Sequence, residues 1–104
     1  MKYLVEVTAS IERGNAIDAQ GGPAPFFAHV VERFKPEAIY GNPTRRQVFL
    51  IVDLPTEADV AELMYLWTWA SGTEPRFIPI MSPEVYAQGI ENAMKAPAIG
   101  RPWS

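Results

Sequence analysis

The alternation of apolar and polar residues predicts four β-strands. Residues 2–9 alternate between two faces, and residues 47–54 form the most strand-like segment of the chain. Residues 37–40 end at the turn formers Gly41-Asn42-Pro43-Thr44 and are therefore predicted to form a hairpin with residues 47–54. Residues 74–81 give the fourth strand, and their two prolines favour an edge position, where no neighbour needs the missing N–H.

Helical spacing predicts three helices, over about residues 23–35, 57–71 and 83–95. The first and the third open on prolines, which the first turn of a helix tolerates because its N–H groups have no partner within the helix. Thr56 is a suitable N-cap for the second helix, and Gly72 closes it.

The resulting order is β-α-β-β-α-β with an added C-terminal helix, which predicts an α+β, ferredoxin-like domain over residues 1–95. In this arrangement two helices cover one face of a four-stranded antiparallel sheet, and the first and third strands are central. Residues 10–22 contain three glycines and are predicted to form a long loop, with room for one helical turn around residues 16–20. Residues 96–104 are predicted to form an extended tail.

The third strand is apolar on both faces, because Val48, Leu50 and Val52 alternate with Phe49 and Ile51. A single two-layer domain would leave one of these rows in water, and an exposed apolar face of this kind is typical of an association site. We therefore expect a homodimer, or a higher homo-oligomer, in which subunits pack sheet to sheet. The residues expected in this interface are Phe49, Ile51, Ile78 and Ile80. The alternative is that the third helix folds back over this face.

The second helix is apolar on two sides. Leu63, Met64 and Trp67 belong to one stripe, whereas Tyr65 and Trp69 project from nearly the opposite side. The second pair is expected to be covered by the third helix or the tail, to form a subunit contact, or to line a ligand cavity.

Composition narrows the classes of function. The 104 residues carry a formal net charge of −3, with one histidine and no cysteine. This length excludes a second domain. The lack of cysteine excludes disulfides, thiolate catalysis and cysteine-ligated metal sites. A single histidine without cysteine cannot complete a tetrahedral metal shell, so we expect no metal, and we expect no cofactor. No apolar run approaches a membrane span and no signal-type segment is present, so we expect a cytoplasmic protein without membrane association. The acidic balance argues against nucleic-acid binding.

Three residues are candidates for acid–base chemistry. His29 is the only histidine, and at helical spacing it lies on the polar flank of the first helix, which favours a solvated position. Glu6 and Asp53 lie on neighbouring central strands, where removal from water could make a carboxylate a general base. The alternative is that both lie at strand ends in water.

Further polar residues surround the hairpin. Tyr40 and Asn42 are candidates to point inward from the rim of the sheet toward a ligand. Arg45 and Arg46 are expected to keep the hairpin edge soluble, and either could also reach a carboxylate-bearing ligand.

The strand over residues 1–7, the helix carrying Phe26-Phe27-Ala28-His29-Val30-Val31, the hairpin at Gly41-Asn42-Pro43 and the helix from Thr56 resemble the dimeric α/β-barrel superfamily of small ferredoxin-like proteins. More narrowly, they are similar to its muconolactone-isomerase-like members and to members with no assigned activity. The likeness covers about residues 1–95 and rests on architecture and pattern, not on a diagnostic motif.

This resemblance implies that two sheets pack into a barrel, with a cavity between each sheet and its helices. The residues that would line it are Tyr3, Val5, Phe27, Val31, Val48, Leu50, Met64 and Trp67. The same residues would equally form a plain core. Members of the superfamily include cofactor-free monooxygenases, isomerases and haem proteins similar to chlorite dismutase. The haem proteins usually offer a histidine from a helix, but the single His29 on a polar flank does not support haem here.

Three functions follow as hypotheses. The leading one is a homodimer that binds a small, mostly apolar molecule or serves as a stable assembly module. The alternative is a cofactor-independent enzyme of the isomerase or monooxygenase type, with a carboxylate or His29 as its base. The third is a protein–protein adaptor that uses Tyr65, Trp69 and the tail through Trp103.

Overall fold

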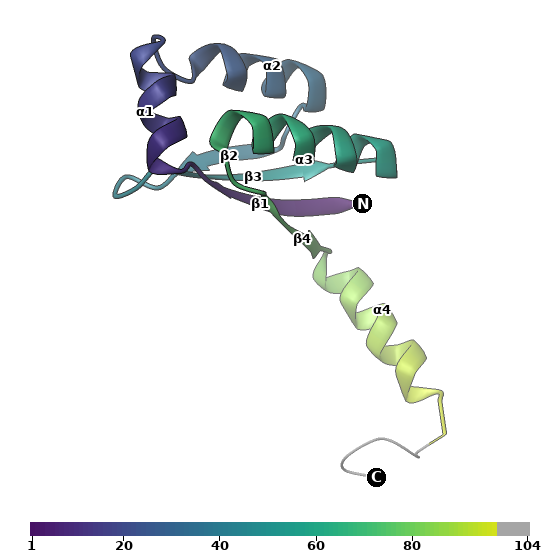
Figure 1. Ribbon diagram of the computed structural model, residues 1–104. Helices are drawn as coiled ribbons and strands as arrows, with labels where there is room; N and C mark the ends of the chain where they lie inside the picture. Colours follow the sequence, from purple (N-terminus) through teal and green to yellow (C-terminus); the bar gives the residue numbers. More distant parts are fainter. Residues whose placement is uncertain (98–104) are drawn as a thin grey trace.

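The computed structural model describes residues 1–97 and shows an α+β fold in which an open four-stranded sheet carries helices (Figure 1). In chain order the elements are β1 (Lys2–Thr8), α1 (Ile11–Ala19), α2 (Ala24–Phe34), β2 (Ala38–Gly41), β3 (Gln47–Asp53), α3 (Glu57–Ser71), β4 (Arg76–Ile80) and α4 (Pro83–Met94). The four predicted strands and three predicted helices are confirmed, and α1 is an addition. No helix within residues 1–97 combines the length and the apolar character needed to cross a bilayer.

The sheet is antiparallel throughout, with the strand order β2-β3-β1-β4. Val5 of β1 lies opposite Leu50 of β3 on one side and Phe77 of β4 on the other. The proline-containing β4 is an edge strand, as its sequence predicted, and β1 and β3 lie in the centre.

The core lies between the sheet and the helices α2 and α3, which cover the same face (Figure 1). Its buried residues are Val5, Val7, Val30, Phe34, Leu50, Val52, Leu54, Leu63 and Trp67. The alternating residues of β1 and β3 thus meet the apolar stripes of the two helices, as the sequence pattern predicted.

The ends of α3 follow directly from its sequence. The Thr56 hydroxyl accepts a hydrogen bond from the Asp59 N–H at 3.1 Å, and the Asp59 carboxylate accepts one from the Thr56 N–H, which completes a capping box. The Arg33 guanidinium of α2 donates to Asp59 and Glu62 at 2.9 Å each, tying the two helices together. The hydrogen bond from Arg33, with a smaller contribution from Thr56, lowers the pKa of Asp59.

The prediction of a loop over residues 10–22 is wrong, because residues 11–19 form the helix α1. The Ser10 hydroxyl caps it by accepting from the Arg13 N–H at 3.1 Å. The Arg13 guanidinium donates to the carbonyl oxygen of Trp69, and that of Arg46 donates to Asn15 and Asp18. Contacts from α3 and the β2–β3 hairpin therefore stabilise a helix whose own sequence contains glycine and asparagine, two weak helix formers.

Within residues 1–97 no helix covers the second face of the sheet, and α4 projects away from it (Figure 1). The alternative in which the C-terminal helix folds back over this face is therefore not what the structure shows. We call this surface the open face; its large apolar residues are Leu4, Phe49, Ile51, Ile78 and Ile80, all partly exposed. Helix α4 is itself exposed throughout and presents Val85, Tyr86, Ile90 and Met94 to its surroundings.

Replacing Gly72 with alanine is expected to lower the free energy of unfolding by about 1–3 kcal/mol. Gly72 ends α3 at a φ of 74°, and a Cβ there would lie 2.5 Å from Cγ of Arg13 and 2.9 Å from Oγ of Ser10. Urea unfolding measures the change. Gly89→Ala is the control, because a Cβ at Gly89 in α4 meets nothing within 4 Å. Equal effects of the two substitutions would contradict the prediction.

Candidate functional site

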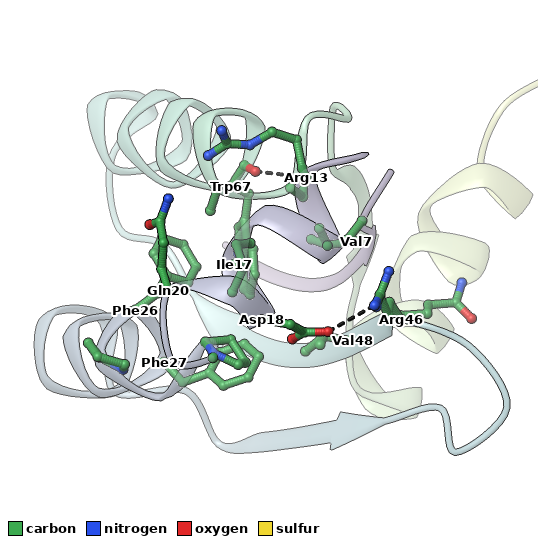
Figure 2. Close-up of a pocket in the computed structure, with 18 of the residues that line it drawn as sticks. Val7, Arg13, Ile17, Asp18, Gln20, Phe26, Phe27, Arg46, Val48 and Trp67 are labelled. Atoms are coloured by element: carbon green, nitrogen blue, oxygen red, sulfur yellow. Dashed lines mark hydrogen bonds and ion pairs between the residues drawn. The ribbon is translucent and has the colours of Figure 1, made fainter. Parts of the chain in front are cut away.

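A pocket of about 530 Å³ opens between α1, the start of α2, the end of α3 and the adjoining ends of β1 and β3 (Figure 2). We call it the α1 pocket. Its apolar lining residues include Val7, Ile17, Phe26, Phe27, Val48, Trp67 and Ala70. Its charged lining residues are Arg13, Asp18, Arg45 and Arg46. The pocket therefore combines an apolar interior with a charged rim, which is the usual composition of a small-molecule site.

Aromatic rings form one side of the α1 pocket. The ring centroid of Trp67 lies 4.7 Å from that of Phe26 in an edge-to-face arrangement and 6.0 Å from that of Phe27. Trp67 is only 4% exposed, yet its indole Nε1 has no hydrogen-bond partner within residues 1–97. A buried N–H donor without a partner is destabilising unless a water or a ligand accepts its hydrogen bond.

Three arginines stand around this pocket, all of them exposed. Arg46 donates to Asp18 at 2.8 Å and to Asn15 at 3.0 Å, and Figure 2 shows the pair with Asp18. Arg13 donates to the carbonyl oxygen of Trp69 at 3.1 Å. Within residues 1–97 the Arg45 guanidinium makes no hydrogen bond or ion pair. Arg45 is therefore the cation of this rim that remains available to a ligand.

Gly14 fixes how closely the hairpin approaches α1. It is the buried residue of that helix, and a Cβ at this position would lie 2.6 Å from Cδ of Arg46. The absence of a side chain lets the Arg46 chain lie against α1 and reach Asp18. In the sequence this glycine was one reason to predict a loop over residues 10–22. The neighbouring residues do not show whether a glycine belongs to a loop or lets the hairpin approach a helix closely.

Two of the predicted ligand-binding residues, Phe27 and Trp67, line the α1 pocket. The other four lie elsewhere. Tyr3 packs edge-to-face against Phe77 at 5.8 Å, and Met64 is partly buried on α3. Tyr40 is exposed on β2. Asn42 stabilises the hairpin turn by accepting hydrogen bonds from the N–H and the hydroxyl of Thr44.

The three predicted acid–base residues do not come together. Glu6 lies on the open face, 3.9 Å from the Arg76 guanidinium. Asp53 ends β3 and pairs with the N-terminal ammonium group at 3.2 Å. His29 is exposed on α2, as its place outside the apolar stripe predicted. Residues 1–97 contain no group of three or more His, Cys, Asp or Glu placed to hold a metal ion.

The predicted interface residues fall into two groups. Phe49, Ile51, Ile78 and Ile80 share the open face. Tyr65 and Trp69 are exposed on the outer side of α3, with ring centroids 5.7 Å apart. Trp103, which was assigned to the same surface, lies outside the described residues.

Sequence reasoning missed the residues that α1 brings to the pocket, chiefly Arg13 and Ile17. It did single out Arg45 and Arg46 as side chains able to reach a carboxylate-bearing ligand, and both line the pocket. Comparison of the chain with protein-family models, with curated proteins and with solved structures finds no match.

Proposed function

We propose that this protein binds a small, mostly apolar molecule in the α1 pocket. The observation that carries the proposal is a pocket of about 530 Å³ that has apolar walls, with Trp67 among them, and a charged rim. Pockets that hold small ligands usually measure roughly 300–1,000 Å³ and combine apolar walls with a few polar groups. The α1 pocket has both properties, and none of the candidate bases Glu6, His29 or Asp53 lines it. Binding is therefore better supported than catalysis.

A panel of aromatic and lactone compounds is expected to contain members that raise the unfolding temperature in proportion to the logarithm of ligand concentration. Ala70→Phe is expected to abolish this stabilisation, because Ala70 lines the pocket and a phenyl ring there would occupy its volume. Differential scanning fluorimetry measures the shifts.

Ala61→Phe is the matched control, because Ala61 is an exposed residue of the same helix that does not line the pocket. This variant should keep the full ligand-dependent shift. A flat response of the wild-type protein across the panel would argue against binding. Shifts of equal size in the wild type and in Ala70→Phe would place the ligand outside the α1 pocket.

We also propose that the subunit has the ferredoxin-like arrangement and associates with a second copy through the open face. The strand order β2-β3-β1-β4 and the position of α2 and α3 on one face support the arrangement. The five large apolar residues of the open face support the association, since an exposed apolar face marks an interaction site. A second copy packed sheet to sheet would cover this face around a two-fold axis. Such packing is what the resemblance to the dimeric α/β-barrel superfamily implies.

A further inference from the structure

We propose that the ligand of the α1 pocket is an aromatic carboxylate whose carboxylate is held by Arg45. This inference rests on the proposed function and adds the chemical class of the ligand. It depends on three features of the pocket: the balance of charge around it, the one arginine without a partner, and the aromatic wall.

The charge around the pocket is opposite to that of the whole chain. The protein has a formal net charge of −3, yet Arg13, Arg45 and Arg46 line the pocket against the single carboxylate of Asp18. Asp18 is already paired with Arg46 at 2.8 Å. The pocket therefore presents excess positive charge to an incoming molecule, and it attracts anions more strongly than the rest of the surface does.

Arg45 is the arginine of the pocket that is available to bind the carboxylate of a ligand. The Arg46 guanidinium donates to Asp18 of α1, and the Arg13 guanidinium of α1 donates to the Trp69 carbonyl of α3. Within residues 1–97 only Arg45, among these three, has no hydrogen bond or ion pair from its guanidinium. One free guanidinium offers a planar pair of N–H donors that matches the two oxygens of one carboxylate. A phosphate dianion would usually need further donors, so the observations favour a carboxylate.

The interior of the pocket favours a ligand with an aromatic body. Phe26 and Phe27 pack beside Trp67, and edge-to-face contacts with these rings favour a flat aromatic molecule. The ligand class is thus an aromatic carboxylate whose ring lies against the aromatic wall and whose carboxylate lies toward the exposed Arg45.

The test compares 6-hydroxy-2-naphthoate with its neutral amide, 6-hydroxy-2-naphthamide, by isothermal titration calorimetry on the full chain. The two probes share shape and aromatic surface and differ in charge. The wild-type protein is expected to bind the carboxylate at least roughly tenfold more tightly than the amide, because a charge-assisted pair with Arg45 is lost. In Arg45→Gln the two probes should bind with about equal affinity, and Arg45→Lys should keep part of the preference.

Arg76→Gln is the matched control, because Arg76 is an exposed arginine of β4 that does not line the pocket. This variant loses the same charge and should keep the full preference for the carboxylate. Equal affinities of the wild type for both probes would overturn the inference while leaving the proposed function intact. A preference that survives in Arg45→Gln would also overturn it. Binding of neither probe, together with a flat response to the compound panel, would overturn the inference and the proposed function.

The indole N–H of Trp67 provides a second, independent readout. In a ¹⁵N–¹H spectrum its resonance is identified by its loss in Trp67→Phe, and it should shift when 6-hydroxy-2-naphthoate is added. The resonance of Trp69, whose side chain is exposed on the outer side of α3, should stay in place. A shift of the Trp69 resonance without a shift of that of Trp67 would overturn the placement of the ligand.

Discussion

Trp67→Ala is expected to lower the free energy of unfolding by about 3–5 kcal/mol, which is a large part of the roughly 5–15 kcal/mol that stabilises a typical domain. Only 4% of Trp67 is exposed, and its ring packs against Phe26 and Phe27 within the core. Its removal would leave a cavity that merges with the α1 pocket. Denaturant unfolding followed by circular dichroism measures the change.

Two further variants make this measurement specific. Trp69→Ala removes the same side chain two residues along α3, where 66% of it is exposed, and should have a much smaller effect. Trp67→Phe keeps an aromatic ring in the core and removes the N–H that has no partner, so it should be less destabilising than the alanine variant. If Trp67→Ala and Trp69→Ala unfolded at the same denaturant concentration, the assignment of Trp67 to the core would be wrong.

Ile51→Lys is expected to convert a dimer into a monomer. Ile51 lies on the open face between Leu4 of β1 and Ala38 of β2, inside the apolar part of that surface. In sheet-to-sheet packing the substitution would bury an unpaired ammonium group in each subunit, which is strongly unfavourable. Light scattering coupled to size exclusion should give a mass near twice 11.6 kDa for the wild type and near 11.6 kDa for the variant.

The stability of the monomer should change little in this variant, because Ile51 is already partly exposed in the single chain. Ala61→Lys, which adds the same charge on the exposed surface of α3, should remain a dimer. A wild-type mass of one chain at micromolar concentration would rule out the proposed association. If the Ile51→Lys protein were still a dimer, the subunits would associate through another surface, such as the outer side of α3.

The sequence was sufficient for the elements whose signals are local. The ends of α3 were predictable because Thr56 and Gly72 act through their own backbone neighbourhood, and both do so in the structure. The edge position of β4 was predictable because prolines restrict where a strand can lie. α1 was not predictable, because contacts distant in sequence hold it in place. Arg13 donates to the carbonyl of Trp69, 56 residues along the chain, and Arg46 donates to Asn15 and Asp18, 31 and 28 residues away.

The candidate site could be predicted only in part for the same reason. Phe27 and Trp67 were identified because their helical spacing places them on the core side of α2 and α3. The position of the pocket at one end of the sheet could not be inferred, since α1 forms one of its walls. The resemblance also implied a cavity between sheet and helices with Tyr3, Val5, Leu50 and Met64 among its lining residues, whereas Val5 and Leu50 are buried in the core of the structure.

The weak attachment of α1 has a consequence for the kinetics of ligand exchange. Gly14 is the buried residue of α1, whereas α3 buries Leu63, Trp67 and Ser71. Elements with few buried apolar side chains open locally at a free energy below that of global unfolding. We therefore expect the proposed ligand to leave when this one short helix detaches, while the sheet and α3 stay folded. On the proposed function, the residence time of the ligand and the thermal stability of the protein would be set by different parts of the chain.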